Sequence, residues 1–166
     1  ELNDEEYKRN YSWDKMLEGL NVYKTKKLHL ATSMRSFRTP DLPLFIKALL
    51  DVNIKEARRL ILGIKDKYPI LLTRDFNEAK KWVREQSKGT TRYGLLASSG
   101  SVRLKPEGIF VKNKISVENW FLNGKNDVRS SYYLEDVVTE FDIQGLELDY
   151  SIVAWDADFR FENDRW

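Results

Sequence analysis

The stretch YPILLTRDFNEAKKWVREQSKGTTRYGLLAS, residues 68–98, decides the fold. It begins with YPILLT and ends with RYGLLAS, two near-continuous apolar runs of the kind that form strands buried on both faces. Between them, NEAKKWVREQ has a helical pattern, with Asp75 as its N-cap and Glu78 completing a capping box. A strand, a helix and a second strand in this order predict a parallel βαβ unit.

The same alternation continues on both sides of this unit. Upstream, the sequence predicts an amphipathic helix, the short strand LHLAT, a helix that begins at Thr39-Pro40, and a helix over IKEARRLILGI. Downstream, it predicts a loop of functional length, ASSGSVRLKPEG, a short helix in ISVENWFLNG, and strands in LEDVVTEF and DYSIVAW. We expect a three-layer α/β fold with a mostly parallel, doubly wound sheet. A helical lead-in over residues 1–26 precedes a single domain over residues 27–166.

The composition indicates a folded globular protein and excludes several kinds of site. The 166 residues are 42% hydrophobic and 13% aromatic, which indicates a folded globule. No run of 18 apolar residues predicts a membrane span, and the first residues show no signal peptide, so we expect a cytoplasmic protein, and a piece of a longer one. The absence of cysteine excludes disulfides, thiolate zinc sites and cysteine nucleophiles. His29 is the only histidine, and its apolar surroundings are more typical of packing than of a catalytic triad.

Charge is distributed unevenly along the chain. Residues 24–38 hold five Lys and Arg and no acid, whereas residues 135–166 hold ten acids and two arginines. One interpretation is that these are scattered solvated faces. The other is a basic surface that meets phosphates, together with an acidic segment that needs a cation, a partner or a neighbouring domain.

Two short stretches carry candidate chemistry. No G-x-x-x-x-G-K-[ST] motif is present, so we expect no phosphate-cradling loop in this chain. Arg35 follows the predicted strand LHLAT, and the carboxyl ends of parallel strands are where open α/β sheets bind ligands. In EFDIQGLELDY, residues 140–150, Gly145 is expected to form a tight strand-to-helix turn that lets backbone N–H groups approach a ligand.

These stretches resemble motifs of superfamily 1 helicases. LATSMRS, residues 30–36, is similar to the fourth motif, L-x-x-N-Y-R-S, and TEFDIQGLE, residues 139–147, is similar to the fifth, T-x-H-x-x-[QK]-G-x-E. The longer strings YPILLTRDFNEAKKW, GLLASSGSVRLKPEG and DVRSSYYLEDVVTEFDIQGLELDYSIVAW resemble the C-terminal part of the Schlafen-group-3-like DNA/RNA helicase family, a bacterial group. The resemblance covers about residues 28–160.

The resemblance implies a RecA-like domain of the P-loop NTPase type, the second helicase domain, without a phosphate loop of its own. Such a domain closes over ATP and Mg²⁺ held mainly by the N-terminal RecA-like domain of the same chain. Arg35 is then expected to reach the γ-phosphate as an arginine finger, which is worth roughly 10³–10⁵ in rate. Gln144 and the Gly145 backbone are expected at the nucleotide edge of the cleft, and Glu147 at the ribose hydroxyl.

By the same resemblance, single-stranded DNA or RNA is expected near Thr73, Arg74 and Thr139. The chain departs from the family pattern at Met34, where an aromatic residue would stack on adenine, and at Phe141, which replaces a histidine. The sixth motif, with a further arginine, is expected beyond residue 166. We therefore expect that this chain alone holds no cofactor and does not hydrolyse ATP.

Two alternatives remain open at this point. A metal-dependent nuclease could use an acidic Mg²⁺ site built around Glu147, Asp149 and Asp156, with Asp142 and Asp158 nearby. A non-catalytic module on the same fold could bind nucleic acid or protein through aromatic residues. The candidate aromatics are Trp82, Trp120, Phe121, Tyr132 and Tyr133.

Overall fold

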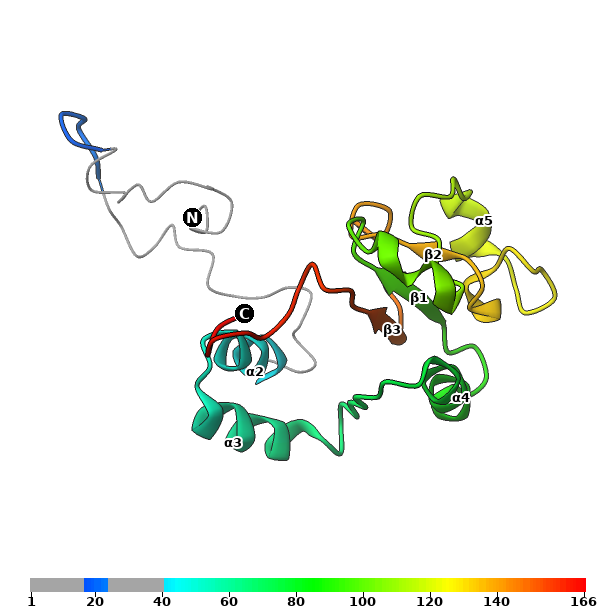
Figure 1. The fold of residues 1–166 in the computed structure, drawn as a ribbon, viewed down its shortest axis with the longest axis horizontal. Helices are drawn as coiled ribbons and strands as arrows, with labels where there is room; N and C mark the ends of the chain where they lie inside the picture. The colour runs from blue at the N-terminus through cyan, green and yellow to red at the C-terminus, as the bar shows by residue number, and fades with distance from the viewer. Residues whose placement is uncertain (1–16, 24–40) are drawn as a thin grey trace. The chain divides into compact units, whose positions relative to one another are not determined.

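The computed structural model describes residues 17–23 and 41–166, which form parts of two compact units (Figure 1). Of the described residues, one unit comprises residues 17–23, 41–49 and 53–68, and the other comprises Leu50–Val52 with Pro69–Trp166. The predicted strand LHLAT, the boundary between residues 26 and 27, and Arg35 lie outside the described residues. Of the predicted lead-in helix, residues 17–23 are described, and residues 17–19 form a turn.

The first unit contains a pair of helices. α2 spans Asp41–Leu50 and α3 spans Ile54–Ile64, as the sequence pattern predicts. Asn53 caps α3, because its side-chain oxygen accepts a hydrogen bond from the Glu56 N–H at 3.2 Å. A small apolar cluster lies in this unit: Ala48, Ala57 and Leu60, with Phe45 packed against them.

The second unit is built on a parallel three-stranded sheet (Figure 1). The central strand β1, Tyr93–Ala97, pairs with β2, Val137–Val138, on one side and with β3, Tyr150–Ala154, on the other. All pairs are parallel, which confirms the prediction of a parallel α/β sheet. β2 is much shorter than the strand predicted in LEDVVTEF.

One helix precedes the strands of the second unit, and further helices lie between β1 and β2. α4, Phe76–Gln86, precedes β1, and the Asp75 carboxylate accepts hydrogen bonds from the Asn77 and Glu78 N–H groups, as predicted for an N-cap. The Asp75 N–H donates to the Thr73 hydroxyl at 3.0 Å and not to Glu78, so the predicted capping box is incomplete. Between β1 and β2 lie α5, Val117–Leu122, and two 3₁₀ helices, η3, Val102–Glu107, and η4, Ser131–Tyr133.

The core of the second unit surrounds β1. Its buried members are Val83, Tyr93, Leu95, Ala97, Ile109, Val111, Tyr132, Leu134 and Val137. The fully buried Trp120 lies so close to the central strand that a Cβ added at Gly94 would come within 2.5 Å of the indole ring. The Trp120 indole N–H also donates to the Asp136 carbonyl at 3.1 Å, just ahead of β2. Glycine at position 94 therefore makes room for the largest buried side chain.

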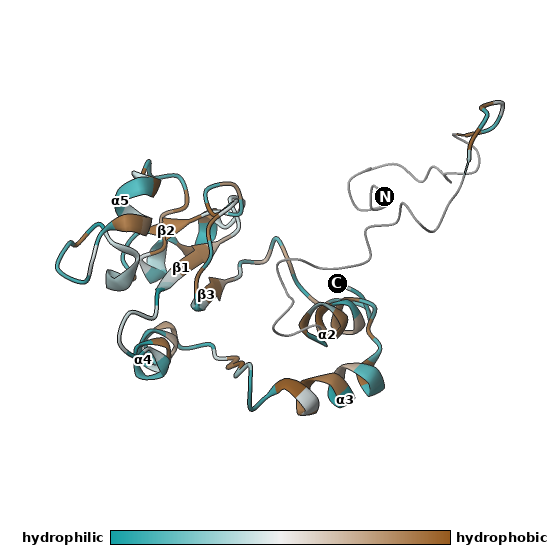
Figure 2. Cartoon of the chain, turned by 180° about the vertical axis from the view of Figure 1, so that it is seen from behind, coloured by the Kyte–Doolittle hydropathy of each residue, from teal (hydrophilic) through white to brown (hydrophobic). Residues whose placement is uncertain are grey.

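The predicted strand YPILLT is the main error in the fold prediction. Residues 69–73 form no regular structure, and the side chains of Ile70, Leu71 and Leu72 are 47%, 47% and 86% exposed (the brown stretch between α3 and α4 in Figure 2). The physical reason is that an apolar run forms a strand only where another strand pairs with it. In the described residues, β1 pairs with β2 and β3, and residues 69–73 pair with no strand of the sheet.

Candidate functional site

The loops that follow the three strands meet at one edge of the sheet. Because β1, β2 and β3 are parallel, their carboxyl ends share an edge, where open α/β sheets bind ligands. The loop after β1 is Ser98-Ser99-Gly100-Ser101, the loop after β2 begins at Thr139, and the segment after β3 begins at Trp155. We call this region the carboxyl edge.

Ser99 ties the loop after β1 to the loop after β2. Its N–H and its hydroxyl each donate to the Glu140 carboxylate at 2.8 Å, and its carbonyl accepts from Lys112 Nζ, also at 2.8 Å. Partial burial opposes ionisation of Glu140, but the hydrogen bonds from Ser99 outweigh it, so the pKa of this carboxyl is lowered. Glu140 therefore stays charged and holds the loop.

A second carboxylate ties η3 to the end of β3. The Arg103 N–H donates to Asp156 Oδ2 at 3.0 Å, and Arg103 Nε lies 3.3 Å from Asp156 Oδ1. The backbone N–H of Ala157 also donates to Asp156, at 2.6 Å, and this bond is the main reason that the pKa of Asp156 is lowered. The loop after β1 and the 3₁₀ helix that follows it are thus held from both neighbouring strands.

Thr139 lies directly after β2 and is buried, with 8% of its surface exposed. Its N–H and its hydroxyl donate to Asp142 Oδ2 at 2.8 and 2.7 Å. These two bonds fold the chain back into the turns over residues 140–145. The hydroxyl that the helicase resemblance assigned to nucleic acid is therefore engaged within its own loop.

Gln144, Gly145 and Glu147 lie in the exposed connection between β2 and β3. Gly145 has a φ of +86°, so a turn that favours glycine is present as predicted. The prediction that a helix follows it is wrong, because the chain passes through residues 146–149 directly into β3. The short connection has too few residues for a helix before the next strand begins.

The connection carries Glu147 away from Thr139. The Asp149 N–H, two residues after Glu147, donates to the carbonyl of Arg92, which immediately precedes β1. Glu147 thus lies near the amino end of β1, whereas Thr139 lies at the carboxyl edge. The structure does not bring these two predicted site residues together.

Thr73 and Arg74 precede α4. The Thr73 hydroxyl accepts the Asp75 N–H, which gives this side chain a local structural role, and Arg74 is exposed. Within residues 17–23 and 41–166, no hydrogen bond or ion pair joins either residue to Thr139. Arg35, the predicted arginine finger, is not among the described residues.

The acidic metal site is not formed. Asp149 lies at the amino end of β3, where its carboxylate accepts the Arg92 N–H at 2.7 Å, whereas Asp156 lies beyond the carboxyl end. At roughly 3.3 Å per residue, the intervening strand separates them by on the order of 20 Å. Across the described part of the chain, no group of three His, Cys, Asp or Glu side chains could hold a metal ion. The structure therefore does not bring Asp149 and Asp156 of the alternative acidic site together.

The aromatic residues suggested for an interaction module belong largely to the core. Trp120 is fully buried, Tyr132 is 9% exposed, and Trp82 packs edge-on against Tyr150. Tyr132 also packs edge-on against Tyr93, with ring centroids 5.1 Å apart. These contacts show that most of the candidate aromatic side chains pack in the core. Tyr133, which is 36% exposed, is the most accessible of the five candidates.

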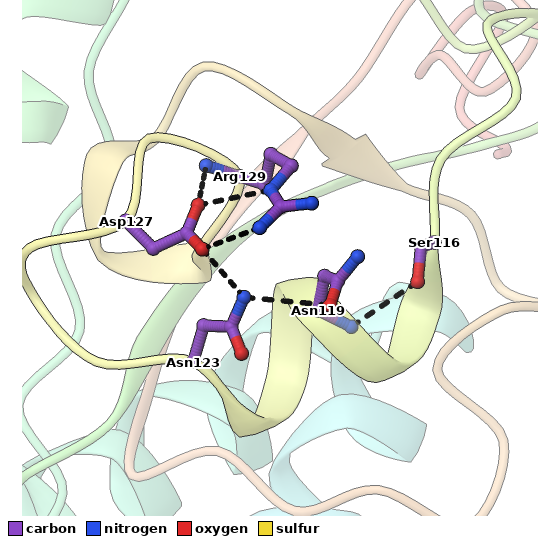
Figure 3. Close-up of polar contacts among 5 residues, drawn as sticks. All are labelled: Ser116, Asn119, Asn123, Asp127 and Arg129. Carbon is purple, nitrogen blue, oxygen red and sulfur yellow. Dashed lines mark hydrogen bonds and ion pairs between the residues drawn. The ribbon is translucent and has the colours of Figure 1, made fainter.

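A polar cluster lies between α5 and η4 (Figure 3). Arg129 donates to both Asp127 oxygens, at 3.1 Å from Nε and 2.8 Å from Nη2, and Asn123 donates to one of them at 2.7 Å. The hydrogen bonds from Arg129 are the main reason that the pKa of Asp127 is lowered to about 2. Arg129 also lines an open pocket of about 350 Å³ with Lys114 and Asp136.

Sequence reasoning identified the Ser- and Gly-rich loop after β1 but missed the residues that hold it. Glu140 and Lys112 bind Ser99 from 41 and 13 residues away in sequence, and Asp156 binds Arg103, just after the loop, from 53 residues away. Nothing in the local pattern of any one of them signals the pairing. The polar composition of the loop was the only available signal.

Comparison with known proteins gives one match. The family described as the Schlafen group 3 DNA/RNA helicase domain matches residues 1–166, the whole chain. No curated protein and no solved structure matches the chain. In the part of the chain that the structure describes, no helix is both long and apolar enough to cross a bilayer. The parallel α/β sheet agrees with the fold expected of a helicase domain, and the chain belongs to the Schlafen group 3 DNA/RNA helicase domain family.

Proposed function

We propose that this chain is the C-terminal motor domain of an ATP-dependent DNA/RNA helicase or translocase of superfamily 1. The observation that carries the proposal is the family match, which extends over all 166 residues. In this proposal an N-terminal RecA-like domain of the same protein holds most of the ATP and Mg²⁺ in the bacterial cytoplasm. The present domain supplies contacts across the cleft and does not hydrolyse ATP alone.

The nucleotide contacts are proposed for the connection between β2 and β3. Gln144 and Glu147 are exposed, and a Cβ at Gly145 would meet no atom within 4 Å, so the backbone there is open to a ligand. In this role, Glu147 accepts a hydrogen bond from the ribose. A hydrogen bond to a charged group contributes about 1.5–3 kcal/mol.

The arginine finger is proposed for Arg35, on the motif LATSMRS. A guanidinium that reaches the γ-phosphate stabilises the charge that develops during phosphoryl transfer. Thr73, Arg74 and Thr139 are proposed to lie near single-stranded DNA or RNA. Of these, Arg74 combines exposure with a permanent positive charge.

The test is the ATPase activity of the intact protein, measured with and without single-stranded DNA and RNA at a fixed salt concentration. Arg35→Ala is expected to lower kcat by roughly 10³-fold or more while nucleotide binding is retained. Arg38→Ala, a nearby arginine outside the motif, is the control and is expected to keep its turnover. Near-normal stimulated turnover in Arg35→Ala refutes the finger assignment.

Glu147→Ala tests the nucleotide connection separately. Loss of the ribose contact is expected to raise the KM for ATP about tenfold or more, with a smaller change for 2′,3′-dideoxy-ATP, which lacks the hydroxyls. Glu85→Ala, an exposed carboxylate on α4, is the matched control. An equal loss for ATP and for the dideoxy nucleotide contradicts the role assigned to Glu147.

A further inference from the structure

The sequence contains one Asn-Gly pair, Asn123-Gly124, and it lies in the polar cluster between α5 and η4 (Figure 3). Asn123 directly follows α5, and Gly124 is exposed. In such a pair the backbone nitrogen of the glycine can attack the side-chain amide carbon of the asparagine, because glycine has no Cβ to obstruct the approach. A Cβ added at Gly124 would meet no atom within 4 Å, so the space beside this residue is open.

The reaction at this pair consumes only water. The Gly124 nitrogen gives up its proton and bonds to Asn123 Cγ, while the Cγ–Nδ2 bond breaks and the side-chain nitrogen leaves with that proton as ammonia. Water then opens the resulting succinimide ring. Cleavage of the new bond between nitrogen and Cγ leaves an aspartate. Cleavage of the original peptide bond leaves an isoaspartate, in which the main chain runs through the former side chain.

The fold opposes this reaction through the side-chain amide of Asn123. Its Nδ2 donates to Asp127 Oδ2 at 2.7 Å and to Asn119 Oδ1 at 3.4 Å (Figure 3). A hydrogen bond to a charged carboxylate is among the stronger ones, and it favours the amide resonance form in which Cγ is less electrophilic. Because Nδ2 must leave Cγ, both hydrogen bonds are lost when the ring closes.

The Asp127 carboxylate is itself held in place. The Arg129 side chain donates to both of its oxygens, and the Arg129 backbone N–H donates to Oδ1 at 2.9 Å. The Asp127 backbone N–H donates to the Gly124 carbonyl at 3.2 Å, which closes the turn that follows Asn123. The carboxylate that accepts from Asn123 is therefore both charged and fixed in direction.

We propose that Asn123 is a deamidation site that forms aspartate and isoaspartate, and that Asp127, positioned by Arg129, slows the reaction while the loop is folded. The reaction then proceeds mainly when residues 123–129 open locally, so the modified fraction records how long the loop has been open. This inference goes beyond the proposed function, because it involves neither nucleotide nor nucleic acid. It assigns a protective role to the cluster in Figure 3.

Deamidation weakens the cluster that slows it. The reaction replaces a donor to Asp127 by a second carboxylate, and two like charges at hydrogen-bond distance repel each other. In isoaspartate the main chain is also longer by a methylene group, which shifts Gly124 and Lys125 relative to α5. Lys125 Nζ donates to the Gly89 carbonyl at 3.1 Å, so this contact between distant segments is disturbed as well. The modified protein is therefore expected to be less stable than the unmodified one.

The experiment follows the intact protein during incubation in native buffer and in concentrated guanidinium chloride, at one pH and one temperature. Trypsin cuts after Lys114 and Lys125, and liquid chromatography with mass spectrometry separates the asparagine, aspartate and isoaspartate forms of the released peptide. We expect modification of Asn123 in the denaturant and a rate lower by about tenfold or more in native buffer. Asn119 lies in the same peptide but precedes Trp120, whose side chain obstructs the attack, so it is the internal control.

Three variants test the protecting group. Asp127→Ala is expected to raise the rate in native buffer by about tenfold or more, because the charged acceptor is lost. Arg129→Ala is expected to raise it by less, because the carboxylate remains but is no longer held. Glu118→Ala removes a carboxylate on α5 that binds Ser116 at 2.9 Å, and this matched control is expected to leave the rate unchanged.

Two further variants test the chemistry and its product. Gly124→Ala places a methyl group beside the attacking nitrogen, where it meets no neighbour, so it is expected to slow the modification in both conditions and to leave the fold intact. Asn123→Asp carries the aspartate product from the start and is expected to lower the urea midpoint of unfolding. Circular dichroism of each variant checks that the fold is retained.

Each outcome either supports or refutes the proposal. If Asn123 stays unmodified in the denaturant, it is not a deamidation site. If the wild-type rate is the same in native buffer as in the denaturant, the fold does not protect it. If Asp127→Ala reacts as slowly as wild type, or if Glu118→Ala reacts as fast as Asp127→Ala, then Asp127 is not the protecting group. A slow native rate that rises in Asp127→Ala and Arg129→Ala alone supports the proposal.

Discussion

Residues 69–73 and residues 93–97 are both short apolar runs, yet only residues 93–97 form a strand. In β1, Leu95 is fully buried between two parallel neighbours, whereas Leu72 is 86% exposed in a segment without regular structure. Intrinsic preference does not separate them, because both are rich in residues that favour strands or cores. The difference is that β1 has a partner on each side.

The ends of the two runs differ in the same way. After β1, Ser99 is held by Glu140 from the loop after β2, 41 residues away in sequence. After residues 69–73, the Thr73 hydroxyl accepts only the N–H of Asp75, two residues away. A run becomes a defined element when long-range contacts fix both its edges and its ends. Four substitutions test this explanation, from the largest expected effect to the smallest.

Leu95→Ala is expected to cause the greatest loss. It removes a fully buried side chain at the centre of the sheet, so the free energy of unfolding should fall by about 2–5 kcal/mol. Urea unfolding followed by circular dichroism measures the change. A loss below about 1 kcal/mol would show that β1 is not the packed centre of this unit.

Gly94→Ala is expected to cost somewhat less. The added Cβ would lie 2.5 Å from two ring atoms of Trp120, so the indole must move, and overpacking of this kind costs about 1–3 kcal/mol. The emission maximum of tryptophan and the midpoint of urea unfolding should both shift. Gly63→Ala, where a Cβ meets nothing within 4 Å and the backbone is helical, is the control and should be neutral or stabilising.

Glu140→Ala tests the long-range anchor at the end of β1. It removes two hydrogen bonds to Ser99 at a mostly exposed site, so the expected loss is about 1 kcal/mol. Because the folded-state pKa of Glu140 lies below its ordinary value of 4.5, its contribution is present above pH 4.5 and is lost as pH falls through the lowered value.

The pH profile therefore provides the measurement for Glu140. The difference in unfolding free energy between wild type and Glu140→Ala should be constant above pH 5.5 and should shrink in more acidic solution. Glu135→Ala, which removes a carboxylate that forms one exposed ion pair with Lys80 at 3.4 Å, is the comparison. A difference that does not depend on pH would mean that the charged carboxylate is not the anchor.

Leu72→Ser is expected to have the smallest effect. The side chain is exposed in a segment that pairs with no strand of the sheet, so stability should change by no more than about 0.5 kcal/mol. The same urea titration serves here. A loss comparable to that of Leu95→Ala would show that residues 69–73 are buried in the intact protein, and would remove the contrast with β1.

The sequence predicted the elements that depend on local signals. The periodicity of IKEARRLILGI and the Asp75 cap led to α3 and α4, and the apolar run RYGLLAS led to β1. The parallel arrangement followed from the alternation of strands and helices. Gly145 was recognised as a turn residue because glycine readily adopts the positive φ that it has here.

The remaining features depend on pairing across the chain. Whether an apolar run joins a sheet depends on whether a distant strand pairs with it, which local composition does not encode. The carboxyl edge also depends on pairing across the chain. In the sequence Glu140 and Asp156 are scattered acids, whereas in the structure they accept hydrogen bonds from Ser99 and Arg103. Acids that might have suggested a metal are in fact hydrogen-bond acceptors for neighbouring loops.

The contact between Gly94 and Trp120 couples the residues that positions 94 and 120 can carry in evolution. The space at position 94 and the ring at position 120 fill a single volume, so a change at one is tolerated only with a compensating change at the other. Gly94→Ala combined with Trp120→Leu should therefore recover part of the stability that Gly94→Ala loses beside the intact ring. Relatives that carry a larger residue at position 94 are expected to carry a smaller one at position 120, so that the two sites evolve as one.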